Sequence, residues 1–298
     1  MSIRASTTDS WPIVGAPRRA GFARRLRRRR TAVAGAAILA IFLAAAAVGP
    51  WLLPYRPNEA DFEQVLRRPS WAHPFGTDNL GRDLLTRVVY GARVSFLIGL
   101  LGVALSVASG VPLGLVSGYW GGRADLLLQR AVDILLAFPG FLLALTLVAV
   151  LGVGVLNVVV SVGLAAAPTY IRLMRGVVLA VREHAYVEAA RAVGASDGRV
   201  LRRHILPNCL APLIVQSTLQ LGTAILTAAG LGFLGLGVRP PTPEWGTMLG
   251  EGQTYVFSSW YIATFPGLAI FLAVMAFNLL GDGLRDALDP RLIGPQGR

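Results

Sequence analysis

The stretch Tyr186-Val-Glu-Ala-Ala-Arg-Ala-Val-Gly-Ala-Ser196, followed by Arg203-His-Ile-Leu-Pro-Asn208, forms a polar, basic island between long apolar segments. Its alanines favour a helix, and Gly194 fits the left-handed residue at which such a helix ends. Ser196 can cap a second helix, with Asp197 at the positive N-terminal end. The stretch therefore predicts a helix–glycine–helix hairpin. On the cytoplasmic face of a membrane domain, such a projecting hairpin is a docking site for another protein.

Apolar residues dominate the rest of the chain. Of its 298 residues 54% are hydrophobic and only 15% are charged, which excludes an ordinary soluble domain. A helix needs about 20 apolar residues to cross the hydrocarbon core of a membrane. Runs of that length predict an all-α membrane protein with six transmembrane helices, at residues 31–53, 94–118, 126–150, 154–173, 211–234 and 263–282.

The arginines indicate the orientation. If both termini lie in the cytoplasm, 21 of the 28 basic residues fall on that side, nine of them in the tail formed by residues 1–30. Membrane proteins collect positive residues there, where anionic headgroups attract them. We therefore expect a multi-pass protein of a bacterial cytoplasmic membrane, with the proline-rich segment 54–93 outside. The net charge of +12 then needs no nucleic-acid partner. The rival interpretation, a nucleic-acid-associated protein, predicts salt-dependent DNA binding by the tail.

The residues that the chain lacks exclude several kinds of chemistry. It has no lysine, which a phosphate-binding P-loop and Schiff-base catalysis both require. Its single cysteine, Cys209, cannot form an intrachain disulfide, and its three histidines are scattered rather than grouped as metal ligands. Hydrolase signatures are missing as well. We expect no catalytic, cofactor or metal site in this chain, so another chain would have to bind any ATP that drives it.

Polar side chains form a stripe in the fifth predicted span. Gln216, Gln220, Thr223 and Thr227 fall at i, i+4, i+7 and i+11, which places them on one face of a helix. Polar groups that face lipid are costly, so the stripe should face protein or water. It either lines a translocation path and bonds transiently with peptide groups, or it forms hydrogen bonds to a partner helix. The sequence favours neither alternative.

Charged residues open the third predicted span, where Asp125 and Gln129 precede Arg130 and Asp133. Arg130 and Asp133 are spaced to pair on one helix face near the cytoplasmic boundary. A structural ion pair at the membrane edge is favoured over a proton relay, because no chain of carboxylates continues inward.

The outer segments carry two further signals. Thr77 or Asp78 can cap a short helix whose apolar face rests on the membrane surface. Between the last two spans, Trp245 and Trp260 fit anchors at the membrane interface.

The spacing of Glu188-Ala189-Ala190, Gly194 and Leu206-Pro207 resembles the EAA loop of importer permeases in the ATP-binding-cassette (ABC) superfamily. One position departs from the general pattern, since His204 stands where that pattern has isoleucine. The ending His-Ile-Leu-Pro-Asn is similar to the dipeptide/oligopeptide/nickel branch. The stretches 73–93, 232–246 and 277–291 also resemble this branch, so the resemblance extends over residues 20–292.

This resemblance, to the C-type transmembrane subunit, implies a type I ABC importer permease fold with a cytoplasmic coupling helix in the loop 183–208. The ATPase-coupling residues would be Glu188, Ala189, Ala190, Gly194, Ser196, Leu206 and Pro207. The implied partners are a second, homologous permease, ATPase subunits that bind ATP and Mg²⁺, an extracytoplasmic substrate-binding protein and the lipid bilayer. The chain itself would be a transport subunit rather than an enzyme.

The domain organisation follows from the same resemblance. Residues 1–30 form the tail, 31–93 the first helix with its outer loop, 94–292 the permease domain and 293–298 a short C-terminal tail. Peptides are the first substrate choice, and nickel or another small solute is the alternative. The rival from another class is a channel or carrier without an ATPase, which should show a continuous path of charges or ion ligands within the membrane. No such path is evident.

Overall fold

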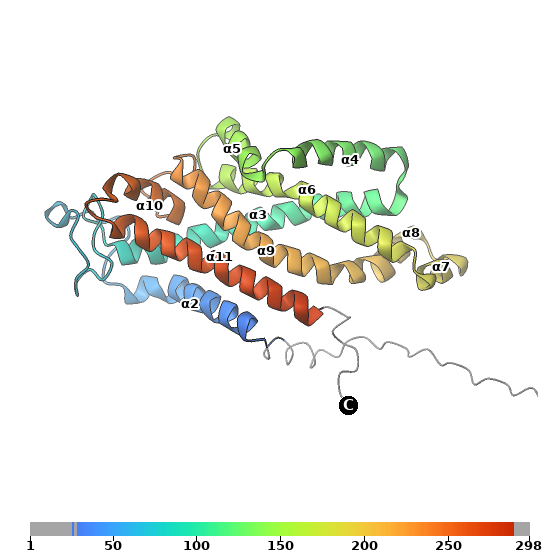
Figure 1. Ribbon diagram of the computed structural model, residues 1–298, viewed down its shortest axis with the longest axis horizontal. Helices are drawn as coiled ribbons and strands as arrows, with labels where there is room; N and C mark the ends of the chain where they lie inside the picture. The colour runs from blue at the N-terminus through green and yellow to red at the C-terminus, as the bar shows by residue number, and fades with distance from the viewer. Residues whose placement is uncertain (1–25, 27–28, 289–298) are drawn as a thin grey trace, which may run out of the picture.

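The computed structural model describes residue 26 and residues 29–288, and Figure 1 shows how their helices are arranged. The predicted tails, 1–30 and 293–298, lie almost wholly outside the described residues. The long elements are α2 (Arg30–Leu52), α3 (Leu84–Trp120), α4 (Gly122–Ala137), α5 (Gly140–Leu151), α6 (Val155–Arg182), α9 (Leu206–Phe233) and α11 (Tyr261–Leu288). The short elements are η1 (Phe62–Gln64), α7 (Ala185–Ala192), α8 (Asp197–Val200), η2 (Leu201–Ile205), α10 (Trp245–Gly252) and η3 (Gln253–Tyr255). Between residues 29 and 288 every one of these elements is a helix, which confirms the predicted all-α class.

Five helices are long and apolar enough to cross a membrane, namely α2, α3, α6, α9 with the turns before it, and α11. The third predicted span, 126–150, is wrong as a single helix, because α4 and α5 meet there at an angle of 93°. The break lies at Phe138, whose backbone is extended (φ −84°, ψ 137°) and which precedes Pro139. Proline sterically excludes its preceding residue from the helical region. The described residues therefore hold six spans only if this bent pair is one of them.

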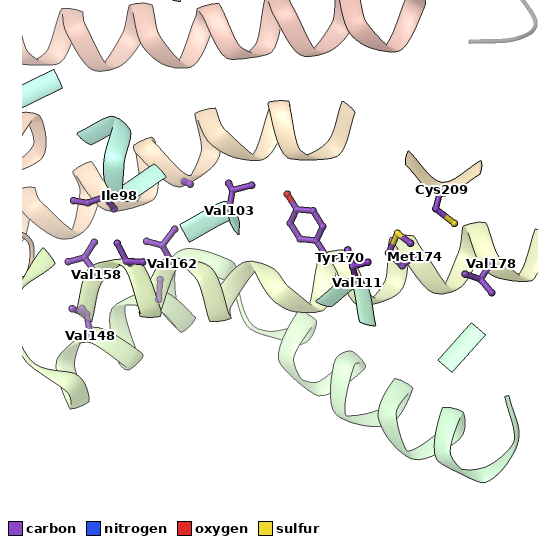
Figure 2. Packing of buried hydrophobic residues seen from close by; sticks show 14 of the residues in the cluster. Ile98, Val103, Val111, Val148, Val158, Val162, Tyr170, Met174, Val178 and Cys209 are labelled. Carbon is purple, nitrogen blue, oxygen red and sulfur yellow. The ribbon is translucent and has the colours of Figure 1, made fainter. Parts of the chain in front are cut away.

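Helices α3 and α6 pack along a row of glycines on α3. A Cβ atom added at Gly110 would lie 2.6 Å from Tyr170 Cβ, and one added at Gly114 would lie 2.6 Å from Met174 Cβ. Lipid supplies little hydrophobic drive for helix association, so close approach and van der Waals packing hold such a pair together. Figure 2 shows Tyr170 and Met174 within the main buried apolar cluster, together with Cys209 from the start of α9.

The start of α3 differs from the prediction. A short helix capped by Thr77 or Asp78 was expected there, whereas the 37-residue α3 begins at Leu84 and is capped by Asp83. Asp83 Oδ2 accepts hydrogen bonds from the Thr86 backbone amide (2.8 Å) and from the Thr86 hydroxyl (2.7 Å). The predicted surface helix is therefore the first part of a long span.

The two tryptophans between the last spans have different environments. Trp260 is exposed, as an interface anchor would be, but Trp245 is fully buried and is not one. Its indole N–H donates to the Val88 carbonyl of α3 at 2.8 Å. A buried tryptophan needs a partner for that N–H, and here the bond fixes α10 against α3.

The bundle has two distinct ends. Helices α7 and α8 lie at one end, while α10 and the loop that connects α2 to α3 lie at the other, as Figure 1 shows. Hereafter the loop formed by residues 54–83 is called the 54–83 segment.

Candidate functional site

The predicted helix–glycine–helix hairpin is present as α7 and α8, with Gly194 between them. Gly194 has φ +82°, the left-handed conformation that side chains other than glycine rarely adopt. Its N–H donates to the Arg191 carbonyl (2.9 Å), and the Ala195 N–H donates to the Ala190 carbonyl (3.0 Å). These two bonds form a Schellman motif, which closes the end of α7. The turn is therefore defined by its backbone, and the expectation for Gly194 is confirmed at the level of local structure.

The second predicted cap is only partly right. Ser196 is the N-cap residue of α8, and its carbonyl accepts from the Arg199 and Val200 amides, but its side chain makes no capping bond. Asp197 stands in the first turn of α8, as expected. Its carboxylate instead accepts a hydrogen bond from the Tyr119 hydroxyl at 2.6 Å.

Buried valines attach the hairpin to the bundle. Val187 of α7 and Val200 of α8 are fully buried and belong to the same apolar cluster as Val178 and Val181 of α6. These side chains pack the apolar sides of α7 and α8 against the end of α6. The hairpin is therefore anchored to the helix bundle by buried apolar contacts.

Tyr119, near the end of α3, contacts both arms of the hairpin. Its hydroxyl binds Asp197 of α8, and the Arg191 guanidinium of α7 lies 5.1 Å from the centre of its ring. No sequence pattern pointed to this residue, because 78 positions separate it from Asp197.

The passage from α8 into α9 contains a π-helical turn, η2. There the Leu206 N–H donates to the Leu201 carbonyl, five residues earlier. Pro207 follows directly and has no N–H to donate, so the ordinary ladder cannot continue through it, and a local π-bulge is one way to absorb that loss. Asn208 then donates to the Tyr186 hydroxyl (3.2 Å), which connects the start of α9 to α7. The Leu-Pro-Asn signal thus marks the point at which the hairpin joins a span.

The predicted coupling residues differ in accessibility. Glu188, Ala189, Gly194, Ser196 and Pro207 are exposed. Ala190 and Leu206 are half-buried. The exposed members on α7 leave a free helix surface at the end of the bundle.

The predicted polar stripe lies on α9. Gln216, Gln220 and Thr227 are half-buried, and Thr223 is exposed. Among residues 29–288 neither glutamine amide has a hydrogen-bond partner, so this chain supplies no interhelical bond to them. Instead, α9 bonds to α6 through Ser217, which accepts from the Tyr170 hydroxyl at 3.3 Å. Whether the stripe lines a path stays a prediction.

The predicted pairing of Arg130 with Asp133 is wrong. Asp133 pairs with Arg172 of α6, and Asp125 receives two hydrogen bonds of 2.7 Å from the Arg175 guanidinium. Arg130 and Asp133 are neighbours in sequence, but the proximity of α6 gives each carboxylate of α4 a better-placed arginine. These pairs fasten α4 to α6. The part of the chain that the structure describes contains no group of three or more His, Cys, Asp or Glu residues placed to hold a metal ion.

Comparisons with known proteins agree with this architecture. Residues 110–294 match the family described as "Binding-protein-dependent transport system inner membrane component", and residues 19–69 match the N-terminal transmembrane domain of oligopeptide transport permease C. The chain is 48% identical, over 88% of each chain, to the di/tripeptide transport system permease protein DppC of Pseudomonas aeruginosa (strain UCBPP-PA14). It is 46% identical to the glutathione transport system permease protein GsiD of Escherichia coli O157:H7, over 92% of this chain and 90% of that protein.

A solved structure supports the fold alone. The chain resembles an inward-facing form of the MetNI methionine ABC transporter with a TM-score of 0.55 at 20% identity, over 68% of this chain and 97% of that one. The helical architecture and the long matches to permeases lead to one assignment. The chain belongs to the family of binding-protein-dependent transport system inner membrane components, as a multi-pass permease of the ABC importer type.

Proposed function

We propose that this chain is one of two transmembrane subunits of an ATP-driven peptide importer, and that the α7–α8 hairpin receives the movement of the ATPase subunits. The observation that carries the proposal is the hairpin itself. It projects from one end of the bundle, is closed by the left-handed Gly194, and is held to α3 and α6 by Tyr119, Val187 and Val200. A hairpin held in this way can pass a movement of the ATPase subunits to α3 and α6 without changing its own shape.

The coupling residues then have distinct roles. Glu188, Ala189 and Ala190 supply the surface of α7 that enters a groove of an ATPase subunit. Gly194 and Ser196 set the angle between the hairpin arms, and Leu206 with Pro207 joins the hairpin to α9. When ATP closes the ATPase subunits, the hairpin moves with them, and the bundle switches between inward- and outward-open states as a rigid body.

Peptides are the proposed substrates. The support is the similarity to permeases whose names specify di- and tripeptides or glutathione, which is itself a tripeptide-sized solute. Gln216, Gln220, Thr223 and Thr227 are the proposed path lining, since their amides and hydroxyls can exchange hydrogen bonds with peptide groups. A second permease would complete this path.

The remaining parts of the proposal concern placement. The protein would lie in the bacterial cytoplasmic membrane with both termini and the hairpin in the cytoplasm, and with the 54–83 segment and α10 outside. ATP and Mg²⁺ would be bound by the ATPase subunits, and an extracytoplasmic binding protein would deliver the peptide.

The test uses the whole transporter in lipid vesicles, with di- and tripeptide uptake and ATP hydrolysis measured together. The variant is Gly194→Pro, because proline is locked near φ −65° and cannot take the conformation at +82°. The control is Gly198→Ala. A Cβ atom would meet no other atom within 4 Å at either glycine, but only Gly194 has a positive φ. We expect the proline variant to assemble and hydrolyse ATP, but its peptide uptake should fall by roughly tenfold or more. The reason is that an altered turn at residue 194 changes the position of α7 relative to the bundle. Normal uptake by this variant, or ATP-driven uptake by the chain without ATPase subunits, would contradict the proposal.

A further inference from the structure

The 54–83 segment exposes a tryptophan at the tip of a firmly held turn. Trp71 is fully exposed, and Phe62 of the same segment is largely exposed. The Ser70 N–H donates to the His73 carbonyl (2.9 Å), and the His73 N–H donates to the Ser70 hydroxyl (3.2 Å), so Trp71 sits in a closed turn. An exposed aromatic held in one place loses little conformational freedom when a partner covers it.

The base of this turn is buried and polar. His73 lies in the interior of the segment, with Nδ1 at 2.9 Å from Asp83 Oδ1 and Nε2 at 2.9 Å from Gln64 Oε1. Tyr55 stacks on the imidazole with 4.6 Å between the ring centres. Because Asp83 is also the cap of α3, the Trp71 turn is connected to a membrane span through two residues. The tip therefore moves with the bundle.

A cavity of about 570 Å³ lies beside the turn. Its lining includes the aromatic residues Tyr55 and Phe62 and the buried His73, and no arginine. Four acidic residues also line it, namely Glu59, Asp61, Glu63 and Asp83. Within residues 29–288 the carboxylates of Glu59 and Glu63 have no ion-pair or hydrogen-bond partner. A concave site with unpaired negative charge favours a positively charged group.

We propose that Trp71 and this cavity together form the surface on which the extracytoplasmic binding protein docks. Trp71 enters an apolar recess of that protein, and one of its lysine or arginine side chains enters the cavity between Glu59 and Glu63. The inference rests on the proposed function and deepens it, because it names the surface and the chemistry of its partner.

The place of the segment favours a protein partner over a membrane surface. In Figure 1 the loop between α2 and α3 lies beyond the ends of α2 and α3, at the end opposite α7. The unpaired carboxylates of the cavity would repel anionic headgroups. A central aromatic within a polar rim is also the usual arrangement of a protein–protein contact, in which tryptophan is over-represented among the residues that dominate affinity. The family description names dependence on a binding protein, which supplies a partner of this kind.

The experiment measures docking of the purified binding protein on the complete transporter in nanodiscs, by surface-based kinetics and by stimulation of ATP hydrolysis. The variants are Trp71→Ala and the double variant Glu59→Gln/Glu63→Gln. The matched control is Trp51→Ala, because Trp51 is also highly exposed but lies on α2 within a candidate span. Co-purification of all subunits checks that each variant assembles.

We expect Trp71→Ala to raise the Kd by roughly thirtyfold, mostly through faster dissociation, as loss of an anchoring aromatic does. The double glutamine variant should slow association by roughly fivefold and flatten its salt dependence, because it removes electrostatic steering. Trp51→Ala should change neither rate.

Two results separate the possible failures. If the unmodified transporter neither binds the binding protein nor responds to it, the proposed function fails and this inference fails with it. If the unmodified transporter responds but Trp71→Ala binds equally well, only the docking surface is overturned. Quenching of Trp71 emission by brominated lipid, measured as the difference from Trp71→Ala, would show a membrane contact and would also overturn it.

Discussion

The Tyr119 hydroxyl donates to Asp197 Oδ1 at 2.6 Å and so connects the end of α3 to the start of α8. The same ring lies beneath the Arg191 guanidinium of α7, at 5.1 Å from its centre. One side chain of a span therefore contacts both arms of the hairpin. Since α3 also packs along α6, the proposed coupling would carry a rotation of the hairpin to two spans at once.

Tyr119→Phe should loosen the hairpin without disturbing the bundle. The ring and its contact with Arg191 remain, while a hydrogen bond to a carboxylate, worth about 1 kcal/mol at this partly solvated place, is lost. Amide hydrogen exchange in residues 185–200 should become about fivefold faster, and peptide uptake per ATP hydrolysed should fall. The control is Tyr170→Phe, which removes a hydroxyl bond inside the bundle instead. Unchanged exchange in the hairpin would show that Tyr119 is only a packing residue.

Asp125→Asn should release α4 from α6. Asp125 receives both bonds of the Arg175 guanidinium and is mostly buried, so its loss leaves that guanidinium without its two-bond partner. A decrease in the free energy of unfolding of about 1–3 kcal/mol is expected. Asp133→Asn is the comparison, because Asp133 and Arg172 are both about half exposed and such pairs contribute about 0–1 kcal/mol. Thermal unfolding in nanodiscs should therefore separate the two variants, and equal melting temperatures would contradict this ranking.

The sequence correctly predicted the structural features that are determined by residues close together along the chain. Gly194 between two helix-forming stretches defines the hairpin locally, because a left-handed residue is needed wherever a Schellman turn closes a helix. The spans also follow from local hydropathy, and five of them match long helices. Average hydropathy missed the bend at Pro139, since Pro and Gly interrupt a helix without making the window less apolar. The prediction of a short helix after Thr77 failed because Asp83 is the cap, and the helix that begins at Leu84 continues into the span for 37 residues.

The sequence could not supply the contacts that join distant elements. Asp133 has Arg130 three residues away, and only the packing of α4 against α6 makes Arg172 its partner. Trp245 is of a residue type that often anchors a helix at the membrane interface, yet α10 packs against α3 and buries it. Tyr119 lies in an apolar span with no distinguishing neighbours. In each case the decisive partner is far away in the chain, and the spacing rules for one helix do not apply.

Gly114→Val should separate α3 from α6. A Cβ atom at Gly114 would lie 2.6 Å from the Ile171 carbonyl oxygen and from Met174 Cβ, and the backbone oxygen cannot move aside without displacing a helix. Overpacking of this kind costs about 1–3 kcal/mol or more, so the variant should unfold at a lower temperature. Gly176→Ala on α6 is the matched control, because its Cβ atom meets no atom within 4 Å. Alanine there should be neutral or stabilising by up to about 1 kcal/mol, and equal losses at both positions would show that the glycine row is not a packing seam.

Arg87→Met should disrupt the end of the bundle that carries α10. The Arg87 side chain is buried, with Nε at 3.4 Å from Asp78 Oδ2 and Nη2 at 3.6 Å from Glu251 Oε2, and Arg82 contacts the same two carboxylates. Removing one arginine leaves two carboxylates to share a single buried cation, and breaking a buried pair typically costs about 3–5 kcal/mol. We expect poor assembly, together with increased protease cleavage between residues 54 and 83.

Arg68→Met should have no such effect, since Arg68 is exposed. The variant that also carries Glu251→Gln should recover part of the loss, because it removes the uncompensated charge as well. If the double variant were no more stable than Arg87→Met alone, the stabilisation would come from packing of the arginine side chain and not from its charge.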